Sequence, residues 1–354
     1  MNKKLFALFL ALTMILSLSG FTACNSSDEE EIPNVSLYDP SKDHEIILTD
    51  FNPRRRSGSI VILNLNRLKQ DWTRLNWKAE EDSSAVIWEW SRPGTEFCGV
   101  KYRELPTGEE YVLAVDSVGQ VFVIDYRTVE VEYRLADDGG TRSTDPDSLY
   151  NAHSAEMLPN GDIIVACSGY GEGSWNYENG GLRYFKQSGS SYVLKSTLSL
   201  PFAHAILWDP SEECLWSVGY EGIVAVDVDS DMGTMEKNEE KSLSESYFTG
   251  HDMVPVYGKD GQFYVSDSGS VYLFDVAAKT LTRSSDYSLS NVKGIAQFDD
   301  GTVITSNWTN YLYVYQTMTQ PDKRGNHVQR IPIAIGNDRD TQIYKVNTCT
   351  PKYE

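Results

Sequence analysis

Four polar side chains recur along the chain at similar positions and could carry chemistry together. Three of the five histidines, His153, His204 and His251, each open an apolar, β-branched segment, and Lys293 opens the next such segment. Three converging imidazoles can bind a divalent metal at about 2.0–2.1 Å and leave a position open for water or substrate. Alternatively, the imidazoles and the lysine could act as base and acid in proton abstraction beside a carboxylate. A third interpretation is that they only satisfy backbone groups and channel water.

Each of these residues begins a repeat made of a strand, a tight turn and a returning strand. The clearest copy is residues 151–168, in which a Pro-Asn-Gly turn separates the two strands. Looser copies start at Cys98, His204, His251 and Lys293. The starts are 42 to 55 residues apart, and no convincing helical segment separates them. A degenerate repeat of this length, carried by short strands, is typical of a β-propeller.

The repeat predicts an all-β fold, a six-bladed β-propeller that spans residues 43–348. Residues 43–90 supply most of one blade but no inner strand, while the C-terminal segment 341–346 is a strand without an obvious partner. Pairing this C-terminal strand with the N-terminal blade would close the ring and remove both free edges. Residues 349–354 are then a short tail.

The propeller prediction also says which side chains meet. Inner strands line the axial channel and run in the same direction, so the residues at their starts share one mouth. The second strands return to the same mouth with Asp50, Asp116, Ser168, Gly219, Asp267 and Asn307. Asp116 and Asp267 could orient the imidazoles as hydrogen-bond acceptors. In the closing blade, Arg339 or Asp340 is expected at the position that Lys293 occupies.

A glycine-rich loop, residues 169–181, lies at the same mouth and carries Tyr170, Trp175 and Tyr177. Aromatic faces on such a loop could stack against sugar rings, since they offer apolar area with a polar edge. Trp308 occupies the equivalent loop of the last blade. The alternative is that these aromatic side chains pack over the blade rim.

The N-terminus has the features of a secretory signal. A short basic start is followed by the apolar run 5–18 and by small residues just before Cys24. Residues 1–23 are therefore predicted to be a lipoprotein signal peptide, and Cys24 the lipidated residue. The acidic stretch that follows makes residues 24–42 a flexible tether. Several acyl chains on one cysteine would anchor the protein without a transmembrane helix.

Charge and cysteine content narrow the partners further. A net charge of −20 argues against nucleic acid and against electrostatic docking onto an anionic membrane, so membrane contact is expected through the lipid anchor only. Cys98, Cys167, Cys214 and Cys349 allow three disulfide pairings. Cys167 and Cys214 lie within apolar strands, where a buried thiol is the expected role.

Several of these features together resemble a known group of proteins. The lipobox, the acidic tether and the segments 86–91, 153–161 and 342–346 resemble an uncharacterised family of Bacteroidetes propeller lipoproteins, a domain of unknown function. The resemblance covers residues 43–348. It implies attachment to the outer membrane, facing the cell exterior, and no particular activity. A fainter similarity, limited to the three histidines, is to oligogalacturonate-lyase propellers, which use channel histidines and a divalent metal.

Two functions follow as expectations. The first is a lipid-anchored cell-surface propeller that binds a glycan, or another small molecule or surface protein, at the channel mouth. The second is a metal-dependent polysaccharide lyase or hydrolase in which His153, His204 and His251 hold the metal. The residues expected to bind ligand in either case are His153, His204, His251, Lys293, Asp116, Asp267, Asn307, Trp175 and Tyr177.

Overall fold

The computed structural model describes residues 44–54, 57–67, 77–78, 85–136, 145, 147–169, 177, 179–284, 287, 290–315, 328–334 and 342–349. All of them belong to one unit, Leu37–Glu354. The predicted signal peptide, Cys24 and the acidic tether lie outside the described residues. Among the residues described, no helix combines the length and the apolar character needed to span a membrane.

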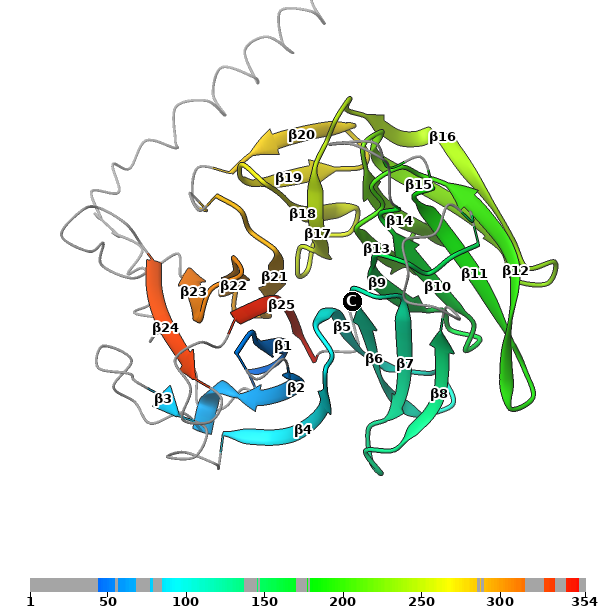
Figure 1. Cartoon of the computed structure of the whole chain (residues 1–354). Coiled ribbons are helices and arrows are strands. Elements are labelled where there is room, and N and C mark those ends of the chain that lie inside the picture. Colours follow the sequence, from blue (N-terminus) through cyan, green and yellow to red (C-terminus); the bar gives the residue numbers. More distant parts are fainter. Residues whose placement is uncertain are drawn as a thin grey trace, which may run out of the picture. The chain divides into compact units, whose positions relative to one another are not determined.

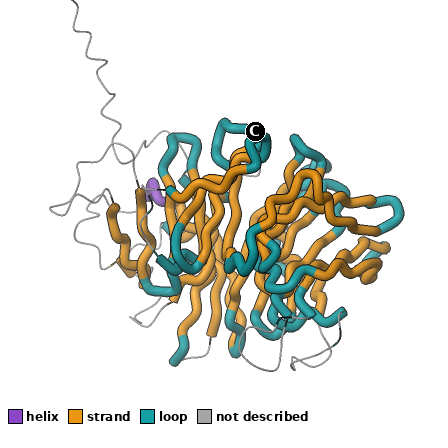
Figure 2. Tube along the Cα trace, turned by 90° about the horizontal axis from the view of Figure 1, so that it is seen from above, coloured by secondary structure: helices purple, strands orange, loops and turns teal. Residues whose placement is uncertain are grey.

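Six small antiparallel sheets form a ring, and each contributes one strand to the axis (Figure 1). From the axis outward, the first blade consists of β25 (Gln342–Thr348), β1 (Glu45–Asn52), β2 (Ser57–Asn64) and β4 (Val86–Pro93). The second blade consists of β5 (Phe97–Glu104), β6 (Glu110–Asp116), β7 (Gln120–Asp125) and β8 (Val131–Ala136). The third blade consists of β9 (Ala152–Met157), β10 (Ile163–Cys167), β11 (Gly181–Ser188) and β12 (Ser191–Ser199). In the same order, the fourth blade consists of β13 (Ala205–Asp209), β14 (Cys214–Gly219), β15 (Gly222–Asp229) and β16 (Thr234–Ser244). The fifth blade consists of β17 (Gly250–Pro255), β18 (Gln262–Asp267), β19 (Val271–Asp275) and β20 (Thr280–Arg283). The sixth blade consists of β21 (Gly294–Gln297), β22 (Val303–Ser306), β23 (Tyr311–Tyr315) and β24 (Val328–Ala334). The strands run between two faces covered by loops (Figure 2).

The C-terminal strand closes the ring, as the sequence predicts. Strand β25 pairs antiparallel with β1, with Leu48 opposite Val346, and becomes the inner strand of the first blade. The inner strands then contact one another in the circular order β25, β5, β9, β13, β17, β21 and back to β25. The six-bladed β-propeller closed by pairing of the two ends of the chain is therefore confirmed.

The hydrophobic core is divided into six clusters, one between each pair of neighbouring blades. Successive side chains of a strand point to opposite faces of its sheet, and both faces of a blade are covered. In β1, for example, Ile46 and Leu48 pack toward the sixth blade, while Ile47 packs toward the second. This explains why second strands of the blades, such as β10 (Ile163–Cys167), read as continuous apolar runs rather than as an alternation of apolar and polar residues.

Two details differ from the sequence-based picture or go beyond it. The sequence predicted either an exposed loop or an outer strand for the polar stretch 230–246. This stretch contains the outer strand β16, which has one half-buried face. The short strand β3 (Trp77–Lys78) adds to the last blade by pairing in parallel with β24.

No disulfide joins Cys98, Cys167, Cys214 and Cys349 to one another. Cys167 and Cys214 are fully buried, as expected for small apolar side chains within strands.

Buried ion pairs fill the channel further along the inner strands. Lys345 on β25 donates to Asp252 on β17, with Nζ and Oδ1 3.0 Å apart, and also donates to the His251 carbonyl oxygen. Asp252 in turn accepts a hydrogen bond from the Ile295 amide on β21 at 2.9 Å. On the other side of the axis, Glu156 on β9 accepts from Lys101 on β5 at 2.8 Å. These contacts join the inner strands of five blades by charge as well as by packing.

Candidate functional site

The three predicted histidines come together at the start of the inner strands. The rings of His153 and His204 stack with their centroids 4.0 Å apart and an angle of 16° between their planes. His251 meets His204 edge to face, with centroids 5.0 Å apart. Lys293 completes the group, since its Nζ lies 2.6 Å from Nε2 of His251. Four consecutive blades therefore contribute one polar side chain each to this site, which we call the hub.

The backbone is irregular where it presents these side chains. The pairing of β9 with β10 skips His153, and the pairing of β17 with β18 skips His251, which places each histidine at a β-bulge. Bulges turn a side chain out of its regular position and are common beside functional sites. Two residues before His153, His204 and Lys293, the chain adopts left-handed φ angles of 59°, 62° and 61° at Asn151, Phe202 and Asn291. For a bulky residue such as Phe202, this conformation is strained and is often retained where function requires it.

A glycine allows the neighbouring inner strand to approach the hub. A Cβ atom on Gly99 of β5 would lie 2.5 Å from the carbonyl oxygen of His153. Only glycine leaves room for that carbonyl. The position of His153 at the axis therefore depends on the absence of a side chain in the second blade.

Hydrogen bonds hold each imidazole in a defined orientation. Nδ1 of His204 lies 2.8 Å from Ser168 Oγ and 3.2 Å from the Phe202 carbonyl oxygen, which favours a proton on Nδ1. Nε2 of His153 contacts Asn151 Oδ1 at 3.1 Å. In contrast, the buried Nδ1 of His251 has no hydrogen-bond partner in the part of the chain that the structure describes. An unsatisfied buried nitrogen is costly and marks a position where a ligand could bind.

All three imidazoles are kept neutral. Burial, with a further contribution from Lys345 and Lys293, lowers the pKa of His153 to about 3. Burial and the neighbouring Lys293 lower the pKa of His251 to about 2, and burial and the other histidines hold the pKa of His204 well below 6.5. Burial and Lys345 also lower the pKa of Lys293 to about 8. At neutral pH, the hub thus offers neutral ring nitrogens beside the single ammonium group of Lys293. Among the described residues, no carboxylate contacts this ammonium group.

A row of rings extends from the hub in both directions. On one side, Phe202 lies 4.0 Å from His204 and stacks on Tyr220 at 4.6 Å, and Tyr220 leads to the exposed Tyr247 at 6.1 Å. A surface pocket of about 400 Å³ lies beside Tyr220 and Tyr247. The row thus runs from the axis to the outer strand of the fourth blade.

On the other side, the row continues onto the closing strand. Tyr344 lies 6.1 Å from His153, with its hydroxyl 3.4 Å from Nδ1 of His153, and the half-exposed Trp308 packs against Tyr344 at 5.6 Å. We call the continuous series Trp308, Tyr344, His153, His204, Phe202, Tyr220 and Tyr247 the aromatic row.

The remaining predicted residues have different surroundings. Asp116 accepts hydrogen bonds from the backbone of its own turn and from the Gln120 side chain. Asp267 likewise accepts from the amides of its turn and from Tyr272. The expectation that these two carboxylates orient the imidazoles is therefore wrong, because donors of their own turns and blades occupy their oxygens. Their predicted part in ligand binding stays a prediction. Asn307 accepts a hydrogen bond from Thr309 and sits next to Trp308.

The glycine-rich loop is described only in part. Tyr177 packs edge to face against Phe202 at 4.9 Å and against Tyr220 at 5.4 Å, so it joins the aromatic row. Tyr170 and Trp175 lie outside the described residues, as do Arg339 and Asp340. Their predicted roles stay predictions.

The hub histidines are not arranged like a preformed metal site. Ring nitrogens lie in the plane of the imidazole, so two rings stacked face to face direct their lone pairs alongside one another rather than toward one point. Within the described ranges, the group whose three ligand atoms all lie within 4.8 Å of one another is His44, Asp299 and Asp300, which is a different site. The metal at the hub remains a prediction.

Sequence reasoning missed Phe202, Tyr220 and Tyr344 as parts of the site. Phe202 stands two residues before His204, as Asn151 stands two before His153, and this equivalence was visible in the sequence. Tyr344 was hidden because the register of the closing strand decides which of its residues faces the mouth. That register becomes known only once β25 is paired with β1.

The fold and the hub together define a class: a six-bladed β-propeller with a polar, aromatic-lined mouth. The chain belongs to the DUF6528 family, described as a family of unknown function, whose model matches residues 109–322. No curated protein matches the sequence.

Two solved structures with TM-scores above 0.5 share the fold at low identity. A functionally unknown protein from Desulfotomaculum acetoxidans is 12% identical with a TM-score of 0.52, covering 86% of this chain and 90% of its own. A chain of a nidogen/laminin complex is 10% identical with a TM-score of 0.54, covering 88% of this chain and 100% of its own. A protein of unknown function from Bacteroides caccae is 12% identical with a TM-score of 0.47, covering 87% and 99%. The lipoprotein anchor and the lyase similarity remain predictions.

Proposed function

We propose that the hub and the aromatic row bind a glycan that carries a carboxylate. The observation that carries this proposal is the convergence of His153, His204, His251 and Lys293 from four consecutive blades. Neutral imidazoles offer hydrogen bonds to hydroxyl groups, and a single ammonium group favours one negative charge on the ligand. A neutral sugar would leave that ammonium group without a counter-charge.

The aromatic row supports a ligand of several rings rather than a single small acid. Aromatic faces contribute apolar contact area to the apolar faces of sugars, and their polar edges accept or donate hydrogen bonds. The row ends in Trp308, 45% exposed, and Tyr247, 82% exposed, so both ends can be reached from solvent. The pocket beside Tyr220 and Tyr247 would take sugar units that lie away from the hub.

A catalytic role remains the second candidate because of Lys293. Its lowered pKa of about 8 and its contact with the neutral His251 are the features expected of a lysine that removes a proton beside a carboxylate. A lyase would convert the bound uronate into an unsaturated product with a new ultraviolet absorbance. Incubating the protein with oligogalacturonates and monitoring this absorbance separates a lyase from a protein that only binds the same ligand.

Replacing Lys293 with methionine is expected to weaken binding of uronic-acid oligosaccharides by about 10- to 100-fold, since a hydrogen bond to a charged group contributes roughly 1.5–3 kcal/mol. Isothermal titration calorimetry of the purified propeller with oligogalacturonates and oligoglucuronates measures this change. Carboxyl-reduced forms of the same oligosaccharides should bind the wild-type protein as weakly as the uronates bind Lys293→Met. Binding should also weaken as the pH rises through about 8, where Lys293 loses its charge.

Lys259→Met is the matched control. Lys259 is an exposed lysine in the turn between β17 and β18, at the end of β17 opposite His251, and its replacement removes the same charge without touching the hub. The proposal fails if no uronate binds, or if Lys293→Met and Lys259→Met bind equally well.

We propose further that Cys24 carries a lipid that holds the propeller at the outer surface of the outer membrane. The small residues before Cys24 and the acidic stretch after it support this location. Mass spectrometry of the protein from its native membranes should find acyl chains on an N-terminal Cys24, and Cys24→Ala should appear in the soluble fraction. Protease added to intact cells should degrade the wild-type protein. A Cys24→Ala variant that stays in the membrane would contradict the anchor.

A further inference from the structure

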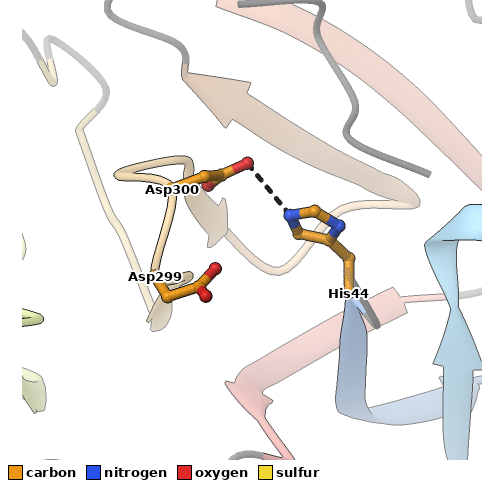
Figure 3. Close-up of side chains that lie close together, drawn as sticks. All are labelled: His44, Asp299 and Asp300. Carbon is orange, nitrogen blue, oxygen red and sulfur yellow. Dashed lines mark hydrogen bonds and ion pairs between the residues drawn. The ribbon is translucent and has the colours of Figure 1, made fainter. Parts of the chain in front are cut away.

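A second group of side chains that could bind a metal ion lies away from the hub, at the junction between the first and last blades. His44 directly precedes β1, while Asp299 and Asp300 form the turn between β21 and β22 (Figure 3). Strand β21 starts beside Lys293 at the hub and ends at this turn, so the group lies at the opposite end of the strand. Blade closure thus brings together side chains 256 residues apart in the chain.

The three side chains have the spacing that a metal ion requires. Nε2 of His44 lies 3.0 Å from Oδ2 of Asp300, and one ligand atom from each of the three residues lies within 4.8 Å of the other two. Ligands held at about 2.0–2.2 Å from one ion are separated by roughly 3.0–3.5 Å. His44 and Asp300 already have this separation, and the exposed Asp299 lies within 4.8 Å of both.

The turn and the ring are held in place by contacts that a metal would not disturb. The Phe298 amide donates to the Thr302 carbonyl at 2.9 Å, and Gly301 adopts a φ of 84°, which glycine tolerates without strain. The Thr302 amide donates to Oδ1 of Asp300 at 2.8 Å and leaves Oδ2 directed at His44. The His44 ring packs edge to face on Phe298, with centroids 4.6 Å apart.

The environment of the group also favours a cation. The side chains of His44 and Asp300 are 5% and 9% exposed, whereas Asp299 is exposed and leaves one side open to water. Oδ2 of Asp300 accepts the hydrogen bond from His44, so a cation would take the place of the proton that these two side chains share.

We propose that His44, Asp299 and Asp300 bind one divalent transition-metal ion, of the Zn²⁺ or Mn²⁺ type, which joins the first blade to the last. One imidazole with two carboxylates suits these ions, whereas Ca²⁺ prefers six to eight oxygen ligands and Mg²⁺ keeps most of its water. The open side leaves positions for water molecules. The site is independent of the proposed glycan binding, because it shares no residue with the hub.

Metal binding is tested on the whole protein after treatment with a chelator. Calorimetric titration with ZnCl₂, MnCl₂, CaCl₂ and MgCl₂ should show one equivalent of Zn²⁺ or Mn²⁺ bound more tightly than Ca²⁺ or Mg²⁺. The melting temperature should rise with the concentration of the bound ion, since a ligand that binds only the folded state stabilises it. Asp299→Asn should weaken this binding by about 100-fold or more, since loss of even a supporting residue typically costs 10- to 100-fold.

Asp299→Asn is the most informative variant, because Asp299 is exposed and its replacement is not expected to disturb folding. Asp260→Asn is its control: Asp260 is exposed and occupies the corresponding turn before a glycine in the fifth blade. The control should bind metal like the wild type. The proposal is overturned if Asp299→Asn retains full affinity, if neither ion binds, or if binding is lost in His153→Asn but kept in Asp299→Asn, which would assign the metal to the hub.

Discussion

Replacing Lys345 with methionine is expected to lower the free energy of unfolding by about 3–5 kcal/mol. The substitution leaves the carboxylate of Asp252 buried, with the Ile295 amide as its remaining hydrogen-bond donor and no cation in contact among the described residues. Both side chains are nearly inaccessible, at 3% and 5% exposure, so water cannot replace the lost ammonium group. Because Lys345 also lies on the strand that closes the ring, the loss should affect the whole propeller. Urea unfolding followed by tryptophan fluorescence measures it.

Lys237→Met provides the comparison. Lys237 pairs with Glu221 at the surface, where the side chains are 23% and 44% exposed, and loss of such a pair costs at most about 1 kcal/mol. The double variant Lys345→Met with Asp252→Asn should recover part of the stability lost in Lys345→Met, because it removes the isolated charge. If Lys345→Met is no less stable than Lys237→Met, the buried pair does not hold the ring together.

Acidification from pH 7 to pH 5 is expected to destabilise the propeller by on the order of 1–2 kcal/mol for each of His153 and His251. The pKa values of His153 and His251 are lowered to about 3 and about 2, from an ordinary value of 6.5. Below pH 6.5 the histidines therefore bind protons in the unfolded chain but not in the folded protein. The stability that depends on these neutral imidazoles is fully present above pH 6.5, and it is lost as the pH falls toward the folded-state pKa values. Unfolding free energies measured at several pH values above 5, where most carboxylates remain charged, report the histidines.

A substitution that removes one titrating group should reduce this slope. His153→Gln is expected to lower the dependence by about 1 kcal/mol per pH unit between pH 5 and 6, even if it also changes stability at neutral pH. Ser268→Ala removes the hydrogen bond to Nε2 of His251 but no titrating group, so it should shift stability without changing the slope. A slope unaltered in His153→Gln would mean that this imidazole is not held neutral in the folded state.

The sequence anticipated the fold closely because propeller strands are short and separated by turns with a clear signature. The predicted starts at Cys98, His153, His204 and His251 lie within one residue of the starts of β5, β9, β13 and β17. The closing strand was anticipated for a thermodynamic reason, since an unpaired strand at each end of the chain would expose backbone groups. The short strand β3 was missed, because two residues carry no detectable periodicity.

Electrostatic partners were harder to anticipate. Asp116 and Asp267 were expected to reach the imidazoles across the mouth, yet each carboxylate binds the amides two to four residues ahead of it. A hydrogen bond to a local donor in a turn costs little entropy, so the carboxylate forms it in preference to a hydrogen bond with a distant imidazole. His44 lies outside the repeat, and its partner Asp300, 256 residues away, becomes a neighbour only through ring closure.

The sequence by itself determined the number of blades, the closing strand and the meeting of three histidines and one lysine at one mouth. These depend on strand order and direction, which a repeating pattern encodes locally. Only the tertiary structure decided how the rings stack, which charges pair across the channel and which side chains extend the row from Trp308 to Tyr247. Those contacts join residues of different blades, and they are fixed by strand register, bulges and close packing around the axis rather than by any local preference.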